Sequence, residues 1–250
     1  MSRILITGAA GNIGLELSRY LHAKHELTLV DVDFSDFPEK LKSATTIIER
    51  DLTELEAWEG LLSQTDYVIH LAGNPDPEAS FDELWQLNYL VPHHLYQSAL
   101  AAKQLKRIIF ASSIHAVDGY PAGKQVKESD SVRPSGMYGI SKVYLEALAN
   151  HYAFNEGIEA IGIRIGDYKA SDDSLIPEMD LYGLAQVLTA ADMNHLIDCC
   201  LVAELSSPYL LINGQSNNTF TRLDLSNARE VLGYQPQDNA FDQAEVDRQD

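Results

Sequence analysis

The segment Arg3-Ile4-Leu5-Ile6-Thr7-Gly8-Ala9-Ala10-Gly11-Asn12-Ile13-Gly14 decides the expected fold. Its first five residues predict a short apolar strand, and the amphipathic pattern after Gly14 predicts a helix, so the glycines lie at a strand-to-helix turn. There Gly8 permits the tight turn, Gly11 lets the backbone approach a pyrophosphate, and Gly14 lets helix and strand pack closely. The helix N-terminus would then face the phosphates. Three glycines in an ordinary turn are the alternative.

An acidic residue ends the second expected strand, Leu27-Thr28-Leu29-Val30-Asp31. A carboxylate at this place binds the adenosine ribose hydroxyls of a dinucleotide and repels a 2′-phosphate. Asp31 therefore favours NAD over NADP, and the nearby Asp33 and Asp36 add to the negative charge. An aspartate that only caps the backbone at the start of a loop is the alternative.

Strands and helices alternate along the chain, which predicts an α/β fold with a Rossmann-like, doubly wound parallel sheet. The further strands are expected at residues 45–48, 67–71, 106–111, 158–166 and 209–213. Ligands of such sheets bind outside the carboxyl ends of the strands. Four candidate site residues fall at such ends: Gly8, Asp31, Gly73 and Ser113.

Helices are expected between these strands, at residues 53–61, 81–103, 138–155, 189–201 and 225–232. Thr53 would cap the first of them, and Pro92 should kink the second. Residues 167–188 are expected to be loop, and the tail from Gln235 to be loosely held. The chain is expected to form a single domain over residues 1–250, with a small C-terminal substrate lobe from about residue 167.

The segment from Ser112 to Lys142 carries the expected chemistry. Ser112 and Ser113 end a strand, whereas Tyr138 and Lys142, four residues apart, share one face of a helix. The ammonium group stabilises a phenolate beside it, and a hydroxyl at the strand end can hold a substrate oxygen against that tyrosine. This arrangement favours proton transfer coupled to a hydride-accepting cofactor.

Three polar residues lie within apolar elements. Arg164 needs an anionic or hydrogen-bonding partner, which the sequence leaves open between a substrate carboxylate and a structural acid. His70 lies inside an apolar strand and is expected to be a core histidine whose hydrogen bonds are satisfied. Asn88 is a candidate for the nicotinamide side of the site, with a surface or backbone-bonding amide as the alternative.

The 250-residue chain has a formal net charge of −19. Because so acidic a surface repels phosphate backbones and anionic lipids, neither nucleic acid nor a membrane surface is expected as a partner. No signal peptide and no apolar run long enough to span a bilayer are apparent. Adjacent Cys199 and Cys200 lack disulfide or metal-ligand spacing, so helix packing, no metal site and a cytoplasmic location are expected.

Taken together, the glycines from Gly8, the serine at position 113 and the Tyr138-x-x-x-Lys142 motif resemble the extended short-chain dehydrogenase/reductase superfamily, of the NAD-dependent epimerase/dehydratase type. The resemblance covers essentially the whole chain. Within the superfamily the chain is most similar to uronate dehydrogenases, through the segments Phe110-Ala111-Ser112-Ser113-x-His115, Ile163-Arg164-Ile165-Gly166 and Leu232-Gly233-Tyr234-Gln235-Pro236.

The resemblance implies an NAD-dependent oxidoreductase that acts on a sugar or sugar-acid hydroxyl. Ser113, Tyr138 and Lys142 would be catalytic, with Tyr138 as the base. The implied cofactor contacts are Gly8, Gly11, Asn12, Ile13, Gly14, Asp31, Asp51, Leu52, Leu71, Ala72, Gly73, Asn88, Ser112, Tyr138 and Lys142. The implied substrate contacts are Ser113, His115, Tyr138 and Arg164, with Arg164 taking a carboxylate by a charge-assisted fork. A homo-oligomer built on helices 81–103 and 135–155 is also implied.

The substrate positions depart from the uronate dehydrogenase pattern. Ile114 replaces an asparagine, Asp167 replaces a serine, and Asn74-Pro75 lacks an expected serine. The resemblance therefore supports the chemistry more than a uronate substrate. Two other functions stay open. A sugar-nucleotide epimerase or dehydratase is disfavoured by the short C-terminal half, and a non-catalytic dinucleotide sensor by the intact catalytic set.

Overall fold

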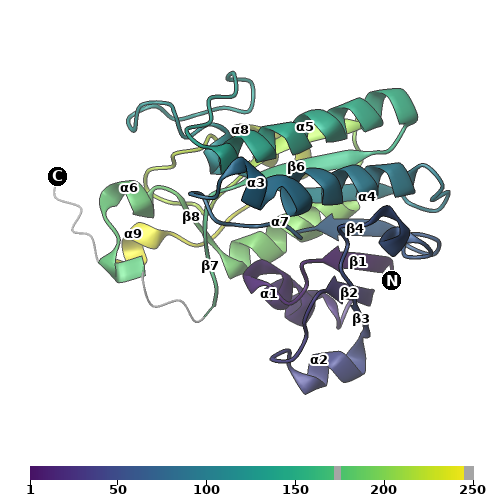
Figure 1. The fold of residues 1–250 in the computed structure, drawn as a ribbon. Helices are drawn as coiled ribbons and strands as arrows, with labels where there is room; N and C mark the ends of the chain where they lie inside the picture. Colours follow the sequence, from purple (N-terminus) through teal and green to yellow (C-terminus); the bar gives the residue numbers. More distant parts are fainter. Residues whose placement is uncertain (172–175, 245–250) are drawn as a thin grey trace.

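The computed structural model describes residues 1–171 and 176–244, and its core is the Rossmann-like parallel sheet expected from the sequence. Within these residues one seven-stranded sheet has the order β3-β2-β1-β4-β5-β6-β9, with every neighbouring pair parallel (Figure 1). The strands are β1 Arg3–Thr7, β2 Glu26–Asp31, β3 Thr46–Glu49, β4 Tyr67–His70, β5 Arg107–Ser113, β6 Ala160–Ile165 and β9 Tyr209–Gly214. The expected fold class is confirmed.

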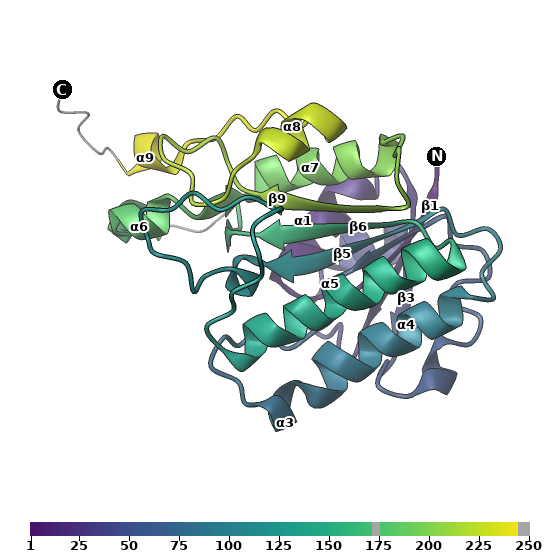
Figure 2. The same ribbon diagram turned by 90° about the horizontal axis from the view of Figure 1, so that it is seen from above.

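Helices cover both faces of this sheet, as Figure 2 shows. One face carries α1 (Asn12–Leu21), α7 (Ala190–Val202) and α8 (Ser226–Leu232). The other carries α4 (Val91–Ala99) and α5 (Met137–Glu156), together with the 3-10 turn η1 (Leu55–Trp58). Side chains of a strand alternate between the two faces: Ile4 and Ile6 of β1 join the first core, and Leu5 joins the second.

The segment from residue 81 differs from the single long helix expected. It begins as α3 (Phe81–Leu84), widens into the π-helical turn η2 (Trp85–Leu90) and continues as α4. Pro92 explains the break, because it has no N–H to donate to the carbonyl four residues earlier. The helix expected from Thr53 is likewise reduced to the short η1, which begins after Glu54 and is followed by Gly60 with a left-handed φ of 79°.

The C-terminal part is more ordered than expected. Residues 167–188, expected as loop, include β7 (Asp167–Lys169), which pairs with β8 (Val187–Thr189), then η4 (Ile176–Glu178) and α6 (Leu181–Leu184). Figure 1 shows α6 beside α9 (Ala240–Gln243), at the end of the molecule away from the N-terminus. In the same range β9 and α7 belong to the main sheet and its helical layer, so a lobe starting at residue 167 is too broad a description.

The tail from Gln235 is fixed as far as the structure describes it, to residue 244. Just before it, Tyr234 is fully buried and its hydroxyl donates to the Gln215 carbonyl at 2.9 Å. The Gln237 N–H donates to the Asp192 carboxylate at 2.7 Å, and Phe241 is buried among the side chains around α6. The expectation of a loosely held tail is therefore wrong up to residue 244, because apolar and capping contacts of this segment outweigh its polar composition. Residues 245–250 lie outside the described residues.

His70 is the core histidine that was expected. It is 2% exposed, and its Nδ1 lies 2.8 Å from the Thr7 hydroxyl, which also accepts the Ala72 N–H. Burial, with a smaller effect of the Lys142 charge, lowers the pKa of His70 to about 3, so the ring is neutral at physiological pH. The contact ties the ends of β1 and β4 together next to the glycine turn. No helix among residues 1–171 and 176–244 is long and apolar enough to cross a membrane.

Candidate active site

A cavity of about 950 Å³ opens at the carboxyl ends of the strands, where ligands of doubly wound sheets bind. Its volume is at the upper end for ligand pockets, which suits a dinucleotide together with a small substrate. Most of the residues expected to bind cofactor or substrate line it: Gly8, Gly11, Asn12, Ile13, Gly14, Asp31, Asp51, Leu52, Leu71, Ala72, Gly73, Ser112, Ser113, His115, Tyr138 and Lys142. Asn88 and Arg164 are not among the lining residues.

The glycine turn brings backbone close to one end of the cavity. Gly8 has a φ of 68°, in the left-handed region that favours glycine. A Cβ on Gly14 would lie 2.2 Å from the Gly8 carbonyl oxygen, so the close packing expected there is present. Gly11 caps α1 without a side-chain hydrogen bond, which leaves the first N–H groups of the helix available to an anion. This cradle fits the pyrophosphate of NAD.

Asp31 has the capping role of its alternative reading and also lies at the cavity wall. One carboxylate oxygen accepts the Ala10 N–H of the glycine turn at 2.9 Å, and the other accepts the Val32 N–H at 2.8 Å. The side chain therefore caps backbone and also lines the cavity. Held in this way, its charge faces the place where the adenosine ribose of a dinucleotide would lie.

Helix α5 brings Tyr138 and Lys142 to the end of β5. A Cβ on Gly139 would lie 2.2 Å from the His115 carbonyl oxygen, so glycine lets α5 dock directly on the turn that follows Ser113. Lys142 is 9% exposed, and its Nζ donates to the Ala111 carbonyl at 3.1 Å. The same Nζ lies 5.3 Å from the centre of the Tyr138 ring. The ammonium group is thus fixed beside the phenol, as the spacing predicts.

Ser113 and His115 complete this corner of the cavity. The Ser113 hydroxyl oxygen accepts the His115 N–H at 3.2 Å, so its own hydrogen can be donated to a ligand. The His115 ring meets the Tyr138 ring edge-on at 5.5 Å, and its Nδ1 lies 2.7 Å from the Asp118 carboxylate. That carboxylate also accepts the N–H and hydroxyl of Ser135, which holds the imidazole in place.

Asn88 acts behind the cavity and not in it. Its amide oxygen accepts the Asn74 N–H at 2.7 Å, and its amide nitrogen donates to the Asn74 carbonyl and the Ser141 hydroxyl, both at 3.1 Å. The amide therefore clamps the segment after Gly73 to helix α5. The alternative of a backbone-bonding amide therefore describes these contacts, and the expected cofactor contact of Asn88 stays a prediction.

Arg164 is paired with a structural acid. It is 1% exposed, and its Nε and Nη2 each donate to a Glu146 carboxylate oxygen at 2.8 Å. The Ser112 hydroxyl donates to the same carboxylate at 2.6 Å, so the hydrogen of this hydroxyl is not available to a ligand. Of the two partners that the sequence leaves open, the structure shows the structural acid, because β6 is buried along its whole length and Glu146 of α5 lies against it. The Nη1 of Arg164 has no hydrogen-bond partner among the described residues, and its contact with a substrate carboxylate stays a prediction.

Sequence reasoning missed Glu146, although a signal was present. Glu146 lies four residues after Lys142 and eight after Tyr138, so it shares their face of the helix. An acid on the buried face of an active-site helix needs a partner as much as Arg164 does. The two unexplained charges could have been paired with each other.

Comparison with known proteins agrees with this site. The model of the NAD dependent epimerase/dehydratase family matches residues 4–171. The chain belongs to this family. An L-arabinose 1-dehydrogenase (NAD(P)(+)) of Haloferax volcanii is 32% identical, over 96% of this chain and 98% of the relative. A NAD-dependent glucose-6-phosphate dehydrogenase of the same organism is 30% identical, over 95% of this chain and 94% of the relative.

Solved structures of family members have the same fold. The uronate dehydrogenase of Agrobacterium tumefaciens superposes with a TM-score of 0.84 at 28% identity, over 100% of this chain and 91% of that chain. The expected family, its similarity to uronate dehydrogenases and its NAD cofactor are confirmed.

Proposed function

We propose that this NAD-dependent oxidoreductase is a dehydrogenase that oxidises a sugar hydroxyl, at C1 of the cyclic form. The observation that carries the proposal is the convergence of Ser113, Tyr138 and Lys142 on one cavity that also contains the dinucleotide cradle. The relatives named as arabinose, glucose-6-phosphate and uronate dehydrogenases support a sugar as the substrate class.

Each of the three residues has a role that its contacts allow. Ser113 donates its hydroxyl hydrogen to the substrate oxygen and so holds it near the phenol of Tyr138. Tyr138, as phenolate, removes the proton of the substrate hydroxyl. Lys142, anchored on the Ala111 carbonyl, stabilises the phenolate by its charge. Bound in the cradle, NAD supplies the acceptor for the hydride that leaves the same carbon.

Net formation of NADH tests the proposal. With NAD and a panel of aldoses and uronates, purified protein is expected to produce NADH continuously, followed by its absorbance. An epimerase or dehydratase would instead convert a sugar nucleotide without net NADH, because it returns the hydride. A dinucleotide sensor would bind NAD and turn over no member of either panel. Each of these two results would reject the proposal and select its alternative.

Two finer features belong to the same proposal. A cytoplasmic location is supported by Cys199 and Cys200, which are both free and buried in α7.

A homo-oligomer formed through the α3–α4 and α5 helices is supported by the exposed apolar side chains on these elements. Phe81, Trp85 and Phe154 are 46%, 45% and 59% exposed.

A further inference from the structure

We propose that the substrate is an uncharged aldose. The substrate end of the cavity is the end that contains Ser113, His115 and Tyr138, and Asp167 makes this end unfavourable for sugars with a carboxylate or phosphate group. The inference rests on the proposed dehydrogenase function and narrows its substrate class. It follows from where the charges of the described residues lie around this end of the cavity.

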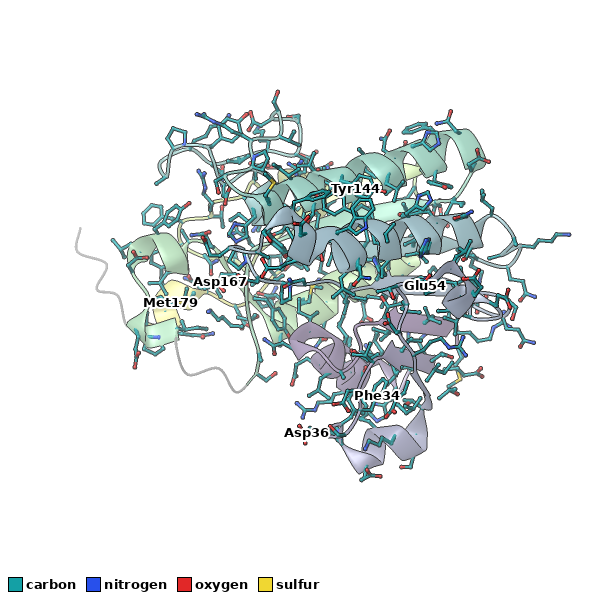
Figure 3. The ribbon with its side chains drawn as sticks, in the orientation of Figure 1. Phe34, Asp36, Glu54, Tyr144, Asp167 and Met179 are labelled. Atoms are coloured by element: carbon teal, nitrogen blue, oxygen red, sulfur yellow. The ribbon has the colours of Figure 1, made fainter. Side chains whose placement is uncertain are left out.

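Asp167 is held firmly at the substrate end. It follows Ile165 by two residues, and Ile165 is the neighbour of Ser113 across β5 and β6. The Asp167 N–H donates to the Gln186 carbonyl at 2.7 Å, which fixes the first residue of β7. Its side chain is 41% exposed and lines the cavity. Figure 3 shows Asp167 on the side of the main sheet where Met179 and the helices α6 and α9 lie.

Gly166, the residue before Asp167, explains why the chain passes so close to the Gln186 carbonyl. A Cβ on Gly166 would lie 2.1 Å from the Gln186 carbonyl oxygen. Only glycine permits this approach, and the approach sets the start of β7, with the Asp167 carboxylate, at the cavity wall. The start of β7 is therefore a fixed part of the cavity wall, and the Asp167 carboxylate is paired there with Lys169.

The basic residues Arg164, Lys142 and Arg222 near this end are held by other groups of the protein, and of these three Lys142 alone lines the cavity, beside Tyr138. Arg164 is buried on Glu146, and Lys142 is bound to the Ala111 carbonyl beside Tyr138. Arg222 is 3% exposed and donates to backbone carbonyls, including those of Tyr120 and Pro121. Neither Arg164 nor Arg222 lines the cavity.

Two further groups could carry positive charge, and each is already balanced. Lys169 lies 3.1 Å from Asp167, but its side chain is 12% exposed and does not line the cavity, whereas that of Asp167 does. Of the Asp167–Lys169 ion pair, the carboxylate is therefore the group at the cavity wall. His115 lines the cavity, but its ring is bound to Asp118, so a charge on it would be compensated.

Substrates with an acidic group would meet this arrangement unfavourably. A carboxylate or phosphate bound at this end loses hydration and gains no ion pair with Arg164 or Arg222, and the Asp167 carboxylate lies nearer to it than the Lys169 ammonium group that offsets its charge. The hydroxyls of a neutral aldose, by contrast, can donate to the Asp167 carboxylate in strong charge-assisted hydrogen bonds. The same argument applies to uronates, sugar phosphates and sugar nucleotides.

A matched substrate panel tests the inference. The pairs are galactose with galacturonate and glucose with both glucuronate and glucose 6-phosphate, and arabinose represents a sugar without C6. We expect kcat/KM for a neutral sugar to exceed that of its acidic counterpart by at least a hundredfold. Preferential turnover of the acidic members would overturn the inference while leaving the dehydrogenase function in place. Turnover of no member would reject the dehydrogenase function itself, and the inference with it.

Two variants separate charge from folding. Asp167→Asn removes the carboxylate and leaves Lys169 without its partner, so the ratio of kcat/KM for galacturonate over galactose should rise at least tenfold. Asp167→Asn with Lys169→Met removes both charges, and the ratio should fall below that of the single variant. Because both measurements are ratios within one protein, partial loss of folded enzyme cancels. An unchanged ratio in Asp167→Asn would show that Asp167 does not determine specificity.

Discussion

Replacing Tyr138 with phenylalanine is expected to lower kcat by about 10²- to 10⁴-fold, the usual contribution of a positioned general acid or base. The phenol is the group in this corner of the cavity whose oxygen can take the substrate proton beside the fixed ammonium of Lys142. NAD binding should change little, because the glycine turn and Asp31 lie elsewhere in the cavity. Initial rates and NAD titration measure the two effects.

Tyr144→Phe is the matched control for this variant. Tyr144 is on the same helix, but its ring packs against Tyr89 at 5.0 Å and does not line the cavity. Its substitution should leave kcat within about twofold, because no proton transfer depends on it. If Tyr138→Phe kept normal turnover, the phenol would not be the base and the proposed mechanism would be wrong.

Replacing Arg164 with leucine is expected to lower the free energy of unfolding by about 3–5 kcal/mol. The substitution leaves the Glu146 carboxylate buried with no cation, and only the Ser112 hydroxyl among its described partners remains. Denaturant unfolding of the wild type and the variant gives the difference. The expected loss is large because the penalty of an unpaired buried charge exceeds the worth of the original pair.

The double variant Arg164→Leu with Glu146→Leu distinguishes a structural pair from a substrate contact. Removing both charges should recover most of the stability lost in the single variant, since apolar replacement of a buried ion pair is often tolerated. An Arg164 that held a substrate carboxylate would behave differently. Its replacement would raise KM for uronates and leave stability nearly unchanged, which would contradict the pairing with Glu146.

Much of the site could be predicted because a parallel sheet brings the carboxyl ends of its strands to one edge. Gly8, Asp31, Gly73 and Ser113 are far apart in the sequence, yet all four line one cavity. Tyr138 and Lys142 follow from helical spacing alone. These inferences need only the element types and their order, which the alternating pattern supplies.

What the sequence could not predict depends on contacts between elements. Arg164 and Asn88 are both polar groups in buried elements, and the sequence does not say which neighbour satisfies them. Their partners, Glu146 and Asn74, are fixed by how α5 and the segment after Gly73 pack. The anchored tail could not be predicted for the same reason. Phe241 is buried against residues around α6 and β8, and strands as short as β7 and β8, with three residues each, give no clear pattern in the sequence.

Transfer of deuterium from the C1 position of a sugar to NAD is the measurement that tests the central claim most directly. Purified protein would be given NAD and C1-deuterated galactose or arabinose, and the reduced nicotinamide would be examined by mass spectrometry. The proposed mechanism predicts NADH that carries one deuterium, together with an oxidised sugar that has lost it. NADH without deuterium, or a sugar that keeps the label while its configuration changes, would contradict oxidation at C1.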